Sequence, residues 1–188
     1  MAVTIQPVGE ALFEDVQTVF GARGQAARCQ CQRYRMGWYD QQSDNVDGRR
    51  ELLRDQVNEG HGLLAYLDGE PVGWCSMAPR CDYRYLRQPT WKGRHEDKDD
   101  ASVWAATCFV IRAGFRRQGI SRALVAGTTD LARDAGARAV EAYPMKPAPG
   151  TDVPWGELHV GALSSFLAAG FQVVHVPSLR RAIVRYDL

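Results

Sequence analysis

The alternation of apolar and polar residues divides the chain into short strands and amphipathic helices. Short apolar runs predict strands, at residues 3–8, 63–67, 72–77, 103–111, 138–143, 171–176 and 183–186. Apolar residues at helical spacing predict helices, at residues 11–20, 48–59, 120–131 and 162–169. Asp68-Gly69 joins two of the strands and is a strong hairpin signal. Asp44 or Asp47 is a candidate cap for the second helix.

The stretch Val103–Leu131 carries the clearest chemical signal. A buried strand is followed by a turn, Arg112–Gly119, which holds glycines and arginines and opens a helix. Such a turn directs free backbone N–H groups and the positive end of a helix dipole at one point, which suits a phosphate or pyrophosphate. An ordinary connection with solvated arginines is the alternative. Neither a P-loop pattern nor G-x-G-x-x-G occurs there, so neither nucleotide-binding motif is supported.

The turn sequence Arg116-Arg117-Gln118-Gly119-Ile120-Ser121 resembles motif A of the GNAT acyltransferase superfamily, [R/Q]-x-x-G-x-[G/A], which also follows a strand. Ser121 stands where the family has Gly or Ala, and Ala113 stands where a proline is frequent. Both departures are small in volume. The chain resembles a bacterial subgroup of GNAT proteins in three places: the C-x-C segment at residues 29–31, the T-C-F-V strand at residues 107–110 and the G-x-x-S-x-F helix at residues 161–166. This resemblance supplies no substrate.

A second segment, Ala162–Phe171, resembles the family pattern N-x-x-A-x-x-x-Y-x-x-x-G-F. His159 occupies the position of the Asn that contacts the pantetheine arm in the family. Phe166 occupies the position of the Tyr that protonates the leaving thiolate, and a phenyl ring has no proton to donate. The two matches lie in the family's order and spacing, and the predicted order of helices and strands resembles that of the family across essentially the whole chain.

The resemblance implies an α/β (α+β) fold, with a central mixed, mostly antiparallel sheet of about six to seven strands flanked by about four helices. Residues 1–188 would form a single domain. The implied activity is an N-acetyltransferase with acetyl-CoA as co-substrate, in which an amine of a small molecule or peptide attacks the thioester directly. A non-catalytic acyl-CoA-binding regulator of the same fold is the alternative that Phe166 favours.

The resemblance also implies where coenzyme A binds. Backbone groups at the end of the central strand would bind the pantetheine arm, and the N–H groups of the turn would bind the pyrophosphate, with arginines adding charge-assisted contacts. A backbone N–H of the strand would polarise the thioester carbonyl. The candidate cofactor-binding residues are Phe109, Val110, Ile111, Arg112, Arg116, Arg117, Gln118, Gly119, Ile120, Ser121, Arg122, His159 and Phe166.

Three residues are candidates for acid–base catalysis: Glu141, Tyr143 and His159. The central strand has no carboxylate, so the glutamate that some relatives use there is absent. Glu141 is a candidate base or a partner for an arginine, and Tyr143 a candidate acid or a packing ring. His159 could act near neutral pH or only contact the pantetheine.

The cysteines add alternatives that the sequence leaves open. Cys29 and Cys31 fit small buried thiols or the wall of an acceptor pocket with the rings of Tyr34, Trp38 and Tyr39. No second pair stands at zinc spacing, so no metal site is predicted. Cys108 has no visible activating neighbour, which favours packing over a nucleophilic role.

The long connection at residues 79–100 predicts a lid or a disordered segment. Its charged part, residues 92–100, predicts a solvated surface.

Composition narrows the partners. The net charge of +1 gives no general attraction to nucleic acid or anionic lipid, although the turn arginines leave a nucleic-acid contact as a weaker alternative. No apolar run reaches the roughly 20 residues of a membrane span, and no signal peptide is recognised. An odd count of 5 cysteines favours a reducing compartment, so we expect a cytoplasmic protein, as a monomer or homodimer.

Overall fold

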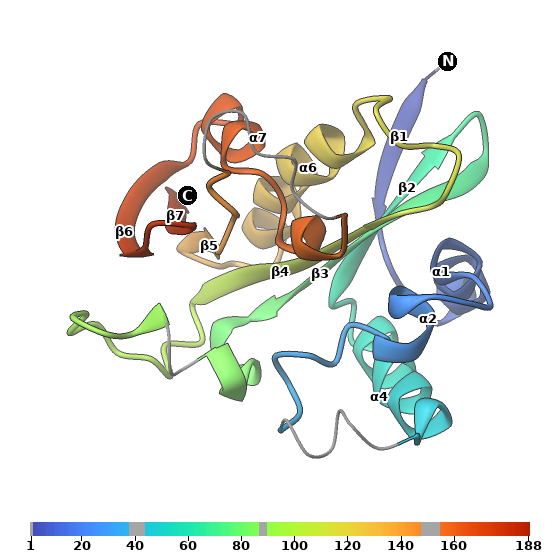
Figure 1. The fold of residues 1–188 in the computed structure, drawn as a ribbon, viewed down its shortest axis with the longest axis horizontal. Helices are drawn as coiled ribbons and strands as arrows, with labels where there is room; N and C mark the ends of the chain where they lie inside the picture. The colour runs from blue at the N-terminus through green and yellow to red at the C-terminus, as the bar shows by residue number, and fades with distance from the viewer. Residues whose placement is uncertain (1, 38–43, 87–89, 148–154) are drawn as a thin grey trace.

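A computed structural model describes residues 2–37, 44–86, 90–147 and 155–188 (Figure 1). A sheet of 7 strands in the order β1-β2-β3-β4-β5-β7-β6 forms its centre. The strands are β1 (Val3–Pro7), β2 (Gly62–Leu67), β3 (Glu70–Pro79), β4 (Val103–Ile111), β5 (Ala139–Ala142), β6 (Gln172–Ser178) and β7 (Arg181–Asp187). Only β4 and β5 pair in parallel within this sheet. The mixed, mostly antiparallel sheet predicted above is therefore confirmed.

The described residues form five α-helices, against the four predicted. They are α1 (Phe13–Phe20), α2 (Gln25–Cys29), α4 (Val46–Asn58), α6 (Ile120–Asp134) and α7 (Leu163–Ala168). Single turns of 3-10 helix stand at Glu10–Leu12, Arg80–Asp82 and Arg84–Leu86, and a longer one at Trp155–Val160. The additional helix is α2, which at 5 residues is too short to show a periodicity. Asn45, not Asp44 or Asp47, caps α4, because its Oδ1 accepts the Gly48 N–H at 2.8 Å.

Helices cover both faces of the sheet (Figure 1). On one face α6 and α7 pack on the strands, where Leu124 and Phe166 meet Phe109 of β4. On the other face α1 and α4 pack on Trp74 of β3 and Val110 of β4. Side chains alternate along a strand, so successive β4 residues belong to different cores.

Helix α6 also lies close to the first strand. A Cβ built on Gly127 would stand 2.8 Å from Ile5 Cγ2, so glycine permits this approach.

The long connection before β4 is anchored to the sheet. Trp91 is 6% exposed, and the guanidinium groups of Arg80 and Arg94 lie 4.7 and 4.2 Å from its ring centroid. Both arginines also bind the carboxylate of Glu141 on β5. The prediction of a solvated surface across residues 92–100 is thus wrong at Arg94, since its side chain is 4% exposed. No helix among the residues described has the length and apolar character to cross a membrane.

Candidate active site

The candidate site begins where β4 and β5 stop pairing. The two strands pair only from Val103 to Ala106 on β4, while β4 itself continues to Ile111. A bulge near Thr107 shifts the register with β3 at the same point. The end of β4 therefore presents an edge that β5 does not cover.

Backbone direction on this edge follows from one hydrogen bond. The N–H of Arg112 donates to the carbonyl of Val72 on β3 at 2.9 Å. Polar backbone groups alternate between the two edges of a strand, so those of Ile111 and Phe109 point to the uncovered side. The polar groups of Val110 point to its β3 partner, Trp74. Of the three strand residues predicted to bind pantetheine, Phe109 and Ile111 have backbone groups available for it.

A cleft of about 670 Å³ adjoins this edge, which is within the usual range of ligand pockets. Its lining combines the end of β4, the turn before α6 and the segment before α7. The residues are Phe109, Ile111, Phe115, Arg116, Arg117, Gly119, Ile120, Ser121, Arg122, Leu158, His159, Gly161, Ala162 and Ser165. Three of them are arginines and, within the described lining, none is a carboxylate, so the cleft suits an anionic ligand.

The turn before α6 has the local structure of an anion-binding site. Gly119 is the N-cap of α6 at φ +81°, a conformation that favours glycine, and a Cβ there would meet nothing within 4 Å. The N–H groups of Gly119, Ile120 and Ser121 donate to no acceptor in the described part of the chain. These donors and the dipole of α6, a helix of 15 residues, all favour negative charge at the cleft.

Not every residue predicted to bind coenzyme A lines the cleft. Arg112 pairs with Glu70 at 2.5 Å and does not belong to the cleft lining. The side-chain amide of Gln118 donates to the Gly114 carbonyl at 3.3 Å. Phe166 is fully buried beneath the cleft, edge-on to the rings of Phe109 and Phe171. Its ring is part of the core and is absent from the cleft lining.

Glu141 and Tyr143 lie in an ionic cluster. The Glu141 carboxylate is fully buried and contacts Arg94 at 2.8 Å, Arg185 at 3.1 Å and Arg80 at 3.2 Å. The Tyr143 hydroxyl donates to its Oε1 at 2.9 Å. Burial favours the neutral acid, but hydrogen bonds and charge from Arg94 and Arg80 outweigh it and lower the pKa of Glu141.

Neither residue of this pair lines the cleft, and burial together with the Glu141 charge raises the pKa of Tyr143 well above its ordinary value. This arrangement favours a structural role over a catalytic one for both residues: Glu141 links the arginines, and Tyr143 is a hydrogen-bond partner of Glu141.

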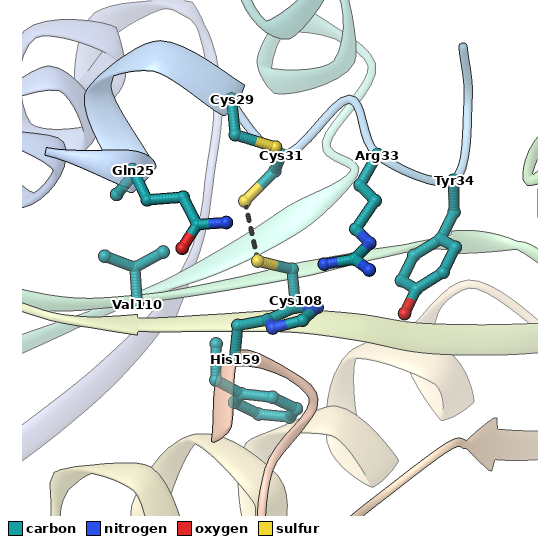
Figure 2. Close-up of a pocket in the computed structure, with 10 residues that line it drawn as sticks. Gln25, Cys29, Cys31, Arg33, Tyr34, Cys108, Val110 and His159 are labelled. Carbon is teal, nitrogen blue, oxygen red and sulfur yellow. Dashed lines mark hydrogen bonds between the residues drawn. The ribbon is translucent and has the colours of Figure 1, made fainter. Parts of the chain in front are cut away.

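His159 has a different setting, because it lines two cavities. It belongs to the cleft and also to a smaller pocket on the α2 side of β4, which we call the thiol pocket. Its ring stacks with that of Tyr34 at a centroid distance of 6.5 Å. The thiol pocket is lined by Gln25, Ala26, Cys29, Cys31, Arg33, Tyr34, Cys108, Phe109, Val110 and His159 (Figure 2).

The thiol pocket gathers residues that the sequence only suggested. The C-x-C segment was one candidate for the wall of an acceptor pocket, and Cys29, Cys31 and Tyr34 do line one cavity. Trp38 and Tyr39 lie outside the described residues. No cluster of three or more metal-ligating side chains occurs in the described ranges. Five further residues line the cleft without having been predicted to bind coenzyme A, because their residue types carry no chemical signal by themselves: Phe115, Leu158, Gly161, Ala162 and Ser165.

Comparison with known proteins identifies the family. The family model of the acetyltransferase (GNAT) family matches residues 26–149. No curated protein matches the chain significantly.

Solved structures similar to the chain include a GCN5-related N-acetyltransferase from Kribbella flavida, with 19% identity, a TM-score of 0.59 and coverage of 100% of this chain and 98% of that one. The PaiA N-acetyltransferase of Thermoplasma acidophilum, in complex with coenzyme A, is 13% identical with a TM-score of 0.54, and both chains are covered completely. YncA of Salmonella typhimurium, an acetyltransferase structure with acetyl-CoA, is 14% identical with a TM-score of 0.57 and coverage of 100% and 95%. These likenesses establish the shared fold, and the family match over more than half of the sequence shows that the chain belongs to the GNAT acetyltransferase family.

Proposed function

We propose that this protein is an acyl-CoA-dependent N-acetyltransferase that transfers acetyl from acetyl-CoA to an amine of a small molecule or peptide. The family uses acetyl-CoA as co-substrate, and two similar structures contain acetyl-CoA or coenzyme A. The observation that carries the proposal is the cleft, in which the N–H groups of Gly119, Ile120 and Ser121, which have no acceptor among the described residues, adjoin the part of β4 that does not pair with β5.

The residues of the cleft fit coenzyme A chemically. The N–H groups at the start of α6, with Arg116, Arg117 and Arg122, would hold the pyrophosphate. Backbone groups of Phe109 and Ile111 would bind the amides of the pantetheine arm, as an added strand would. When bound, acetyl-CoA supplies an activated acyl thioester.

The protein must also remove a proton from the acceptor amine. Among the three predicted catalytic residues, His159 alone lines the cleft, and it also lines the thiol pocket, which we propose as the acceptor side of the site. Imidazole exchanges protons near neutral pH, so we propose His159 as the base. Alignment of the amine by the two cavities supplies a large part of the rate enhancement.

His159→Asn provides a sharp test, because Asn is the residue that the family carries at this position. If His159 is the base, His159→Asn and His159→Gln both reduce kcat by about 10²-fold or more, with unchanged affinity for coenzyme A. If His159 only contacts pantetheine, the Asn variant keeps its kcat. Release of free thiol from acetyl-CoA with an amine panel gives the rates, and calorimetric titration gives the affinity.

A second candidate function, a non-catalytic acyl-CoA-binding regulator, is favoured by Phe166. This ring lies in the core at the position where the family has a tyrosine acid, so no side-chain acid stands there. The two functions differ in one measurement. Tight binding of acetyl-CoA without thiol release by any amine of the panel would support the regulator.

A further inference from the structure

Two cysteines distant in sequence meet in the thiol pocket. The Sγ atoms of Cys31 and Cys108, 77 residues apart, are separated by 3.0 Å. In Figure 2, Cys31 points toward β4 from the turn after α2, and Cys108 points toward it from the strand. Cys29 lines the same pocket, and all three thiols are reduced in this structure.

The backbone at Cys31 and at the residue before it, Gln30, is strained, and this conformation positions the Cys31 sulfur. Gln30 and Cys31 have φ of +48° and +54°, a left-handed conformation that is unfavourable for residues other than glycine. Such strain persists only where the surroundings enforce it. Here it holds Cys31, which is 5% exposed, against a strand that belongs to the candidate site.

A buried glutamine network enforces this turn. The side chain of Gln30 donates to the Ala27 carbonyl at 2.8 Å, and the Gln17 amide donates to Gln30 Oε1 at 2.9 Å. Gln32 donates to the Gln30 carbonyl at 3.0 Å and accepts from Gln56 at 3.1 Å. Because Gln30, Gln32 and Gln56 are each no more than 4% exposed, the network is part of the core.

We propose that Cys31 and Cys108 are a redox modification site, oxidised by a peroxide to a disulfide that ties the α2 turn to β4. One thiol of the pair loses its proton, and the thiolate attacks hydrogen peroxide, breaks the O–O bond and forms a sulfenic acid. The hydroxide that leaves takes up a proton in place of the one that the thiol lost and becomes water. The second sulfur attacks the sulfenic acid, forms the S–S bond and expels a second water. Two thiols and one peroxide thus give one disulfide and two waters.

The geometry makes this bond accessible and consequential. Sulfurs of a disulfide are about 2.05 Å apart, so closure requires an approach of roughly 1 Å. The cross-link joins two walls of a pocket of about 50 Å³ and fixes its size. An effect of the cross-link on turnover rests on the proposed function, because it assumes that the acceptor enters the thiol pocket. Formation of the cross-link does not depend on the proposed function.

Peptide mapping of the full-length protein tests the proposal. After hydrogen peroxide treatment and alkylation in denaturant, we expect one disulfide-linked peptide pair, joining residues 31 and 108, that dithiothreitol reverses. Cys108→Ser should abolish it. Cys81→Ser should not, because Cys81 lies outside the thiol pocket. Burial raises the pKa of the Cys31 thiol, so oxidation should accelerate with rising pH.

The outcomes separate this proposal from the proposed function. A 31–108 cross-link establishes the site whatever the activity. Pairing of Cys29 with Cys31, or sulfinic acid without a cross-link, would overturn it. Where transferase activity is present, the oxidised protein should lose most of its turnover but retain affinity for coenzyme A, because neither cysteine lines the cleft.

Discussion

Substitution of Glu141 by Gln keeps the shape of the side chain and removes its charge. In the native protein this carboxylate faces three guanidinium groups whose side chains are 1%, 4% and 13% exposed, those of Arg80, Arg94 and Arg185. In the variant Glu96, which is 41% exposed, is the one carboxylate that still pairs with these cations within the described residues. Removal of one partner from a buried ionic cluster destabilises a protein by about 3–5 kcal/mol.

That loss corresponds to a fall of about 6–20 °C in Tm for a chain of this size, at roughly 2–4 °C per kcal/mol. Thermal and urea unfolding of Glu141→Gln measure it. Glu96→Gln is the matched control, since it neutralises a half-exposed partner of the same arginines and should change stability by about 1 kcal/mol or less. A Glu141→Gln variant as stable as this control would refute the ionic cross-link.

The pH dependence follows from the lowered pKa of Glu141. A carboxyl whose pKa is lower in the folded state stabilises the fold above its unfolded pKa of about 4.3. This contribution is lost as pH falls from there through the lower pKa of the folded state. The native protein should therefore lose stability in acid more steeply than Glu141→Gln.

The same variant separates the two roles of Glu141, because loss of a catalytic base reduces kcat by about 10²-fold or more while the protein is still folded.

Three further predictions concern the cleft, the helix over it and the acceptor. Gly119→Glu should abolish binding of coenzyme A, since it places a carboxylate at the N–H groups of the turn, whereas Gly119→Asn should bind coenzyme A, because Asn tolerates the left-handed backbone. Calorimetric titration compares the two variants, and tight binding by the Glu variant would exclude the phosphate site. Gly127→Ala should destabilise the fold by about 1–3 kcal/mol through its clash with Ile5, as measured by urea unfolding, and a stable variant would show that α6 can shift. The described lining of the thiol pocket has an arginine, Arg33, and no carboxylate. The kcat/KM should therefore be higher for acceptor amines without further positive charge than for polyamines, and the reverse order in an amine panel would place the acceptor elsewhere.

Local features of the fold followed from the sequence because they depend on neighbouring residues. The hairpin at Asp68-Gly69 is confirmed, and both residues adopt positive φ, as its turn type requires. The strand, turn and helix around Gly119 were predicted from an apolar run, a glycine and a helical period. The sequence of the C-x-C segment is consistent with buried thiols or with a pocket wall and does not decide between them.

Contacts between distant segments were decided by the tertiary structure. Glu141 contacts arginines from the connection before β4 and from β7. The residues next to Glu141 in the sequence do not show whether it is part of an ionic cluster or a catalytic base. Cys31 and Cys108 come together because the turn after α2 faces β4. The periodicity of a sequence determines which side of an element is buried, but the partner on that side depends on how the whole chain packs.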